Sequence, residues 1–294
     1  MSKAIWTGIV VAALGLGTLA VLAQSQTVMG QTKPRIFDSE FDSEEAAMKE
    51  VQTVMGPTKT PFGGQVSSWA KLDAMGRVLE AGITVPMSVV EKAPLPGPND
   101  KPPAEGGPGF GPQAILEFPE AVKKTTFLDH VEVWWQGFGH PPERYLAPHF
   151  DLHFFGVSAA EVAKIDCKDL TPPALELTPK GYAPAVPPGA NAAEFCVPLM
   201  GFHGVPMSEF SAPGQLKPGL FDHVLIAGFY KGQYIFSEPM ITREFLLKKQ
   251  NLDLEVSRPA KVGRKTLYST RFKPTYDAKA NAYHLAYSNF QAGE

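Results

Sequence analysis

The chain of 294 residues has few cysteines, few histidines and no excess of basic residues. Its 27 lysines and arginines are balanced by 30 aspartates and glutamates, which gives a net charge of −3. A mildly acidic chain without a basic stripe is not typical of proteins that bind nucleic acid. We therefore expect no nucleic-acid partner.

The sequence also lacks the short motifs that mark common catalytic and nucleotide-binding sites. It contains no Gly-x-Ser-x-Gly elbow, no Walker loop and no His-Glu-x-x-His zinc motif. The glycines of segment 106–111 do not follow a strand and open a helix, so they do not predict a phosphate-binding loop. We expect no nucleotide cofactor, and whether the protein is an enzyme stays open.

A long apolar run at the N-terminus indicates export. It spans residues 5–22, follows Lys3, and ends in the small-residue pattern Val21-Leu22-Ala23 that a signal peptidase needs. We interpret residues 1–23 as a signal peptide; a retained membrane anchor is the alternative, because the run approaches spanning length. Either way the remaining chain is periplasmic or secreted, and after cleavage we expect no stable membrane insertion.

Cys167 and Cys196 are the only cysteines. In an exported protein, two thiols predict a disulfide. Closing a loop of this length would contribute roughly 3–4 kcal/mol to the free energy of unfolding. A metal site that contains cysteine is the alternative, although the pair lacks the short Cys-x-x-Cys spacing typical of zinc.

The composition predicts a flexible linker over residues 24–62 and one folded domain over residues 63–294. The linker is polar, and its segment 26–33 recurs almost unchanged as 52–59. Two copies do not make a solenoid, which needs at least three repeats, so we interpret them as a local duplication. An acidic stretch lies between the copies and predicts one short helix capped by Ser43.

Short aromatic or alternating segments between Gly and Pro turns predict a mainly β fold. We expect a single antiparallel β-barrel or sandwich with a few short helices and long Pro/Gly-rich loops at 94–113 and 171–191. The expected strands are 65–73, 78–85, 115–118, 130–136, 149–157, 223–230, 234–236, 272–276 and 282–287. The expected helices are 87–92, 158–165 with a Ser158/Glu161 capping box, and 242–249 as the only other one.

The segment Pro148–Phe155 is the best candidate for a site. His149, Asp151 and His153 alternate with bulky apolar residues, which predicts a strand with one polar face. A helix is the alternative, because residues four apart share a helix face. On a strand the two histidines lie roughly 13 Å apart at their Cα atoms, so one ion would more easily take one histidine with Asp151 and further ligands from neighbouring strands.

Three other residues stand in settings that fit such a site. His140 lies in a loop between two predicted strands, His203 follows Cys196 closely, and Glu238 ends a predicted strand among apolar residues, where a carboxylate needs a partner. The other histidines, at 130, 223 and 284, are expected to be structural. The candidate metal ligands are therefore His140, His149, Asp151, His153, His203 and Glu238.

Four motifs occur in a fixed order, in the segments 135–140, 148–154, 200–203 and 238–242, with Tyr145 between the first two. Together they resemble an exported bacterial family of unknown function, whose members share Gly-His-x-Pro, Pro-His-Phe-Asp-x-His-Phe and Glu-Pro-Met-x-Thr. The resemblance covers roughly residues 63–290 and implies that the six candidate ligands match the family's polar positions. The loop 94–113 is longer than is usual in that family. The family has no settled activity, so the resemblance implies a fold and a site but no reaction.

Two functions fit this pattern. The first is an exported protein that binds a metal or small ligand, with zinc, copper, iron or manganese at the His/carboxylate site and an open position for water or substrate. The second is a non-catalytic envelope protein in which the polar cluster is a structural hydrogen-bond network, supporting a ligand or a homo-oligomer.

Overall fold

The computed structural model describes residues 50–107, 109–261 and 265–293. They belong to one compact unit that runs from Asp42 to Glu294. The signal peptide, the capped helix at Ser43 and the first copy of the repeat lie outside the described residues. Within the described part of the chain, no helix is long and apolar enough to cross a membrane.

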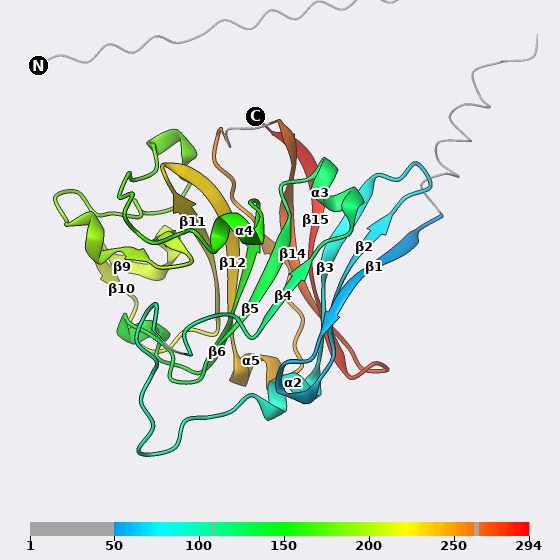
Figure 1. The fold of residues 1–294 in the computed structure, drawn as a ribbon, viewed down its shortest axis with the longest axis horizontal. Coiled ribbons are helices and arrows are strands. Elements are labelled where there is room, and N and C mark those ends of the chain that lie inside the picture. Colours follow the sequence, from blue (N-terminus) through cyan, green and yellow to red (C-terminus); the bar gives the residue numbers. More distant parts are fainter. Residues whose placement is uncertain (1–49, 108, 262–264, 294) are drawn as a thin grey trace, which may run out of the picture. The chain divides into compact units, whose positions relative to one another are not determined.

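The fold is mainly β and antiparallel, as expected. One sheet has six strands in the order β1-β2-β3-β15-β14-β13, and a second, curled sheet has seven in the order β4-β5-β6-β12-β11-β8-β7 (Figure 1). The six-stranded sheet comprises β1 (Gln52–Lys59), β2 (Val66–Leu72), β3 (Val78–Pro86), β13 (Leu254–Glu255), β14 (Thr266–Asp277) and β15 (Ala282–Gly293). The seven-stranded sheet comprises β4 (Ala114–Glu117), β5 (His130–Gln136), β6 (His149–Phe155), β7 (Cys196–Val197), β8 (Gly201–Gly204), β11 (His223–Tyr230) and β12 (Gln233–Thr242).

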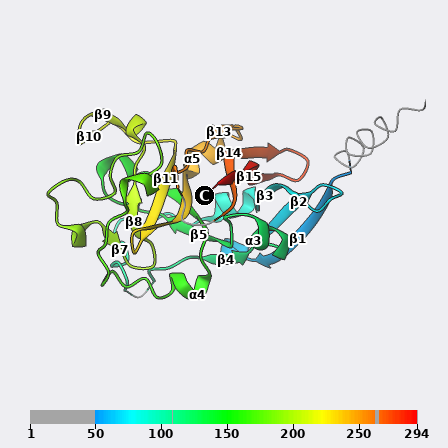
Figure 2. The same cartoon turned by 90° about the horizontal axis from the view of Figure 1, so that it is seen from above.

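Short elements complete the fold. A small ribbon of β9 (Phe210–Ala212) and β10 (Gln215–Leu216) lies far from β1 and β2 in both views (Figures 1 and 2). The helices are α2 (Met87–Lys92), α3 (Glu120–Thr125), α4 (Ala159–Val162) and α5 (Arg243–Leu247). Single 3-10 turns occur at Pro61–Gly63, Glu143–Tyr145, Leu175–Leu177, Ala192–Glu194 and Met207–Glu209.

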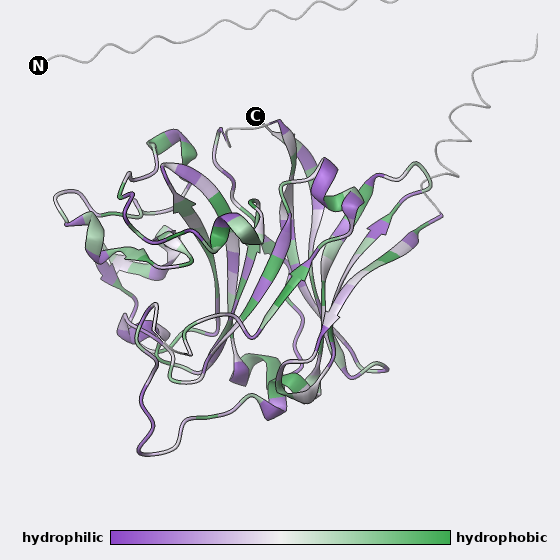
Figure 3. Ribbon diagram, viewed as in Figure 1, coloured by the Kyte–Doolittle hydropathy of each residue, from purple (hydrophilic) through white to green (hydrophobic). Residues whose placement is uncertain are grey.

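The hydrophobic core lies between the two sheets. Successive side chains of a strand point to opposite faces of its sheet, and apolar and polar residues alternate along strands of both sheets (Figure 3), so that each sheet has an apolar face. Phe154 of β6 packs edge-on against Tyr287 of β15, with 4.8 Å between ring centroids. The Tyr287 hydroxyl donates to Ser237 Oγ of β12 at 2.6 Å, which ties the sheets through a buried hydrogen bond. Burial of each such aromatic side chain contributes about 1.5–3 kcal/mol to the free energy of unfolding, so this packing stabilises the association of the two sheets.

Several expected elements are confirmed with small changes in their ends. β5 and β11 have the expected bounds, and β6 begins at the expected His149. The capping box at α4 is present: Ser158 Oγ accepts from the backbone N–H of Glu161, whose carboxylate accepts in return from the backbone of Ser158. The expected loop at 94–113 contains no helix or strand among its described residues, and the loop at 171–191 contains one 3-10 turn, Leu175–Leu177.

The expectation that the linker extends to residue 62 is wrong, because β1 pairs antiparallel with β2. β1 is an edge strand with mostly exposed side chains, held by backbone hydrogen bonds rather than by an apolar face. The pairing shifts register between Met55 and Thr58, where Gly56 and Pro57 lie. A Cβ at Gly56 would lie 2.2 Å from Ser68 Oγ, so only glycine allows this close approach.

Two further expectations need correction. The helix at 242–249 is not the only other helix, because α3 also forms; with six residues and only Val122 buried, it has no readable apolar period. Glu238 does not end a strand, because β12 continues through Pro239 to Thr242. Glu238 and Pro239 are not paired with β6, and the pairing resumes at Met240. Pro239, which has no backbone N–H to donate, therefore lies where no partner on β6 is paired with it.

Candidate metal-binding site

One face of β6 carries the polar side chains of the candidate site. Phe154 points toward the six-stranded sheet, so His149, Asp151 and His153 point to the opposite side of the seven-stranded sheet. All three are fully or almost fully buried. The interpretation of this segment as a strand is confirmed, and the helical alternative is wrong.

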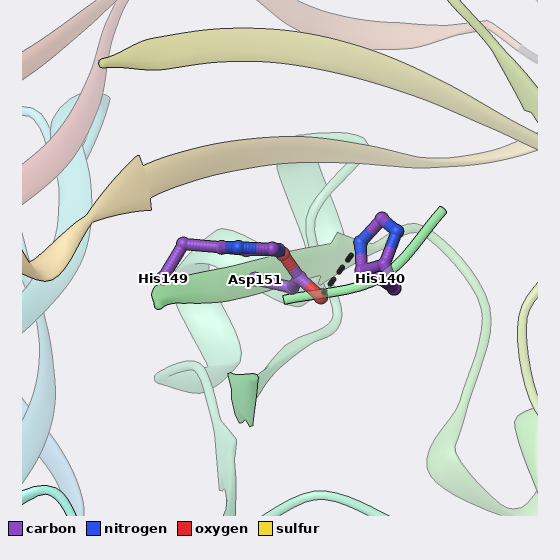
Figure 4. Close-up of side chains that lie close together, drawn as sticks. All are labelled: His140, His149 and Asp151. Atoms are coloured by element: carbon purple, nitrogen blue, oxygen red, sulfur yellow. Dashed lines mark ion pairs between the residues drawn. The ribbon is translucent and has the colours of Figure 1, made fainter. Parts of the chain in front are cut away.

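The first group of possible ligands consists of His140, His149 and Asp151. The Asp151 carboxylate lies between the two imidazoles (Figure 4), with Oδ1 3.0 Å from His149 Nε2 and Oδ2 3.8 Å from His140 Nε2. His140 comes from the loop between β5 and β6, and 35% of its side chain is exposed. A strand and a loop therefore bring three possible ligands, two imidazoles and one carboxylate, to one point at the edge of the buried face.

Backbone carbonyls orient both imidazoles of this group. The carbonyl of Ala147 lies 2.6 Å from His149 Nδ1, and the carbonyl of Pro141 lies 2.9 Å from His140 Nδ1. A carbonyl only accepts, so each Nδ1 donates the hydrogen of this bond, and Nε2 of each ring faces the Asp151 carboxylate. Metal-ligating histidines in proteins are typically held in this way.

The second group consists of His153, His203 and Glu238, from β6, β8 and β12. Glu238 Oε1 lies 3.4 Å from His153 Nε2, and Oε2 lies 3.8 Å from His203 Nε2. The register on both sides of the unpaired positions places Glu238 opposite His153. His203 pairs with Gly228 of β11, and the Phe236 ring fills the space where a Cβ of that glycine would be. The missing side chain of Gly228 therefore gives Phe236 a place between the two imidazoles, with ring centroids 4.9 Å from His153 and 5.5 Å from His203.

Many polar atoms of these groups are buried without a hydrogen-bond partner in the described residues. In the second group these are both ring nitrogens of His153 and Glu238 Oε2. In the first group His149 Nε2 and Asp151 Oδ1 lie 3.0 Å apart, and they form a hydrogen bond only when that nitrogen carries a proton. An unsatisfied buried polar atom costs about 1–3 kcal/mol and is rare in native proteins. Ligand atoms that share a tetrahedral zinc ion lie roughly 3.3 Å apart, given bonds of about 2.0–2.1 Å. The spacing in both groups, and the missing partners in the second group, therefore fit a shared cation.

The first group combines a charged acid with a basic imidazole. Burial opposes ionisation of Asp151, yet the histidines around it, His149 first, hold the pKa of this carboxyl well below its usual value. Burial likewise disfavours a charged His149, but the Asp151 carboxylate outweighs it and raises the pKa of this imidazole. A metal that binds here would displace the proton of His149, because ligands bind in their deprotonated form.

In the second group burial is the dominant effect, and it favours the uncharged form of all three side chains. Burial lowers the pKa of His153 to about 3 and that of His203 to about 4. Burial, with a contribution from the Asp151 charge, raises the pKa of Glu238 well above its usual value. Both imidazoles are thus in the neutral form that ligates metals, and a bound cation would be needed to ionise Glu238.

All six predicted ligands reach this face of the seven-stranded sheet, but they form two groups of three rather than one centre. His149 and His153 fall in different groups, in keeping with the long spacing between alternate positions on a strand. Each group contains two imidazoles and one carboxylate. The sequence could not show which carboxylate joins which histidines.

Sequence reasoning missed a third buried cluster, on β5. His130 lies 3.1 Å from Asp129 and 3.6 Å from Glu132, and the Trp134 indole donates to Glu132 at 2.9 Å. Glu132 is opposite His153 in the β5–β6 register, so this cluster adjoins the second group. The alternation His130, Glu132, Trp134 was the available signal, since all three share the face of His153.

The disulfide between Cys167 and Cys196 is confirmed, with 5.8 Å between the Cα atoms. The alternative, a cysteine-containing metal site, is therefore wrong. Cys196 lies on β7, opposite Phe202 of β8, and the next residue of β8 is the ligand candidate His203. The cross-link thus secures the edge of the sheet from which the second group takes one of its histidines.

Comparison of the chain with known protein families, with curated proteins and with solved structures finds no match. The family resemblance of the four motifs stays a prediction.

Proposed function

We propose that the protein is an exported metal-binding protein whose two groups each hold one transition-metal ion. The observation that carries this proposal is the convergence of three ligand atoms, all within 4.8 Å of one another, in each group. Burial without hydrogen-bond partners supports it, because an ion would satisfy these atoms together.

The ligand set favours particular metals. Two imidazoles and one carboxylate suit zinc, iron, copper or manganese, whereas calcium prefers six to eight oxygen ligands. Three protein ligands leave at least one position for water or a substrate, as in catalytic zinc sites and non-haem iron oxygenases. His140 and His203 keep 35% and 25% of their side chains exposed, so solvent can approach each group from one side.

Export fits the covalent structure. A disulfide persists in oxidising compartments such as the periplasm and is rare in the cytosol. Together with the predicted signal peptide, it supports a periplasmic or secreted protein.

The second candidate is an envelope protein without a metal, in which the buried groups form a structural network. The cluster of His130, Asp129, Glu132 and Trp134 favours this reading locally, because His130 Nδ1 lies 3.1 Å from Asp129 and the Trp134 indole donates to Glu132. Of its ring nitrogens, only His130 Nε2 is buried without a hydrogen-bond partner in the described residues. The two readings differ in one measurable respect: only the first makes thermal stability depend on added metal.

Metal content of the purified mature chain tests the proposal. We expect close to two equivalents after reconstitution with zinc, manganese, iron or copper. His149→Ala should weaken the first group by about tenfold or more and leave the second, and Glu238→Ala should do the reverse. His284→Ala is the matched control, because His284 lies on the six-stranded sheet outside both groups. Less than about 0.2 equivalents of each metal after reconstitution, with no rise in melting temperature, would exclude stoichiometric binding and overturn the proposal.

A further inference from the structure

The outer face of the six-stranded sheet holds a second concave site. A groove of about 410 Å³ crosses β1, β2, β3, β15 and β14. In Figure 1 these are the blue to cyan strands β1 to β3 and the orange to red strands β14 and β15. Its lining residues alternate with core residues such as Ala70, Ala81 and Tyr287, so the groove faces away from the seven-stranded sheet and from both ligand groups. Its volume falls within the range of small-molecule sites, about 300–1,000 Å³.

Small residues at the centre of the sheet make the hollow. In the register across three strands, Trp69 is opposite Gly82, and Gly82 is opposite Ala286. A Cβ at Gly82 would lie 2.4 Å from the carbonyl of Leu285, so no side chain fits there. The Trp69 indole and the His284 imidazole lie beside this hollow and pack edge to face, with 5.9 Å between their ring centroids.

Two buried polar atoms of the groove have no hydrogen-bond partner in the described part of the chain. They are Trp69 Nε1 and Ser288 Oγ, in side chains that are more than nine-tenths buried. Both residues line the groove. The indole N–H can only donate, so it calls for an acceptor. An acceptor-rich ligand in the groove would remove the cost of leaving these groups unpaired.

The charges of the groove favour a negative ligand. Lys71 and Lys273 line it with a single carboxylate, Glu80. His284 also lines it, 3.7 Å from Asp277 and hydrogen-bonded to Thr84 Oγ1 at 2.9 Å. Lys71 is paired with Glu80 at 2.7 Å, while Lys273 keeps only a 3.9 Å contact with Asp253. Threonine hydroxyls from three strands add further hydrogen-bonding groups. Lys273 and the Trp69 indole can only donate hydrogen bonds, and the carboxylate of Glu80 is already paired with Lys71, so the groove offers more free donors than free acceptors of fixed type.

The same groove also offers an apolar wall. The Trp69 ring, Met55 of the edge strand and Ala286 all line it. A free inorganic anion would leave this wall in contact with water, whereas a ligand with a hydrocarbon body would cover it. We propose that the groove binds a small organic carboxylate, whose acid group meets the lysines and the indole N–H and whose apolar body packs on Trp69.

Titration calorimetry on the full mature chain tests this site with two probes and their neutral counterparts. We expect benzoate or hexanoate to bind saturably, one per chain, with a dissociation constant of roughly 1 mM or tighter. Benzamide and hexanamide should bind at least about tenfold more weakly, because they lack the charge that the lysines complement. Added salt should weaken carboxylate binding.

Two conservative variants locate the binding. Trp69→Phe keeps an aromatic ring and removes the unpaired N–H together with part of the ring surface, and Lys273→Met keeps the length of a side chain that is 44% exposed. Each should weaken carboxylate binding by about tenfold, the usual effect of losing a hydrogen bond to a charged group. Lys124→Met on α3 is the control that should leave it unchanged, because Lys124 lies outside the groove.

Three results would overturn the proposal: no saturable binding of either carboxylate below roughly 10 mM, equal affinity for the amides, or unchanged affinity in both variants. Ser288→Ala gives an independent third variant if Trp69→Phe unfolds. Loss of metal binding has no bearing on this test, since the groove contains none of the six metal-ligand candidates.

Discussion

At the scale of single residues, the orientation of each imidazole decides what it can bind. The Nε2 atoms of His140 and His149 face Asp151, because the Nδ1 atom of each ring donates a hydrogen bond to a backbone carbonyl. His153 has no hydrogen-bond partner on either ring nitrogen within the described residues, so only its surroundings hold it, chiefly the Phe236 and Phe155 rings. The first group is thus fixed by hydrogen bonds and the second by packing.

Asp73 allows a prediction about acid stability at a residue remote from both groups. Its carboxylate accepts from the backbone N–H groups of Met75 and Arg77 and from Arg77 Nε at 2.7 Å, which closes the β2–β3 turn. Burial opposes its ionisation, but these bonds lower the pKa of Asp73 below its usual value. A lowered folded-state pKa stabilises the fold above the unfolded pKa, about 3.9, and the contribution disappears as the pH falls through the folded value.

The prediction is therefore that Asp73→Asn destabilises the protein at pH 7 and that its difference from the parent shrinks below about pH 4. Urea unfolding at a series of pH values measures it. Asp100→Asn, which removes an exposed carboxylate in a loop, is the control. A difference that stays constant from pH 7 to pH 3 would contradict the assignment.

At the scale of elements, the edge of the seven-stranded sheet controls the second group. β8 has only four residues and three paired positions with β11, and its other neighbour is the two-residue β7. The disulfide holds β7 in place against the long loop that precedes it. His203 therefore depends on a cross-link that lies outside its own strand.

We predict that the double variant Cys167→Ser/Cys196→Ser weakens metal binding at the second group by about tenfold or more and leaves the first group unchanged, because ligand positioning sets affinity. Each group is measured alone, in a His149→Ala or a Glu238→Ala background. Loss of the cross-link should also lower the free energy of unfolding by roughly 3–4 kcal/mol, so binding is compared well below the melting temperature. Equal weakening of both groups would point to general loosening instead.

At the scale of the whole molecule, the two sheets share one core but carry different chemistry on their outer faces. The seven-stranded sheet places imidazoles and carboxylates in a buried cluster, and the six-stranded sheet places lysines around an open groove. The Tyr287–Ser237 hydrogen bond and the aromatic packing of Phe154 hold the sheets together. Both proposed sites therefore depend on a single folding unit.

Tyr287→Phe tests that dependence. It removes the hydroxyl that donates to Ser237 across the core, and we expect a loss of about 1–3 kcal/mol in the free energy of unfolding because a buried polar group is left unpaired. Tyr276→Phe removes an exposed hydroxyl bound to Asn281 and should change stability by less than about 0.5 kcal/mol. Denaturant titrations compare the two variants, and similar losses in both would argue against a special role for the buried bond.

Much of the fold could be predicted from the residues themselves. Alternation of polar and apolar side chains predicted β5 and β6, the turn that follows Tyr230 predicted the end of β11, and the spacing of Ser158 and Glu161 predicted the cap of α4. These features are local, since each depends on neighbours along the chain. β1 could not be found in this way, because its stability comes from backbone pairing with β2 and not from its own pattern.

The sequence by itself determined which residues can ligate a metal and that His149, Asp151 and His153 share one face of a strand, because that follows from a period of two. Only the tertiary structure decided that the six ligands divide into two groups. The division depends on the sheet order β6-β12-β11-β8 and on the loop that carries His140. The groove around Trp69 was equally hidden, since its walls come from five strands whose order in the sheet is set by long-range pairing.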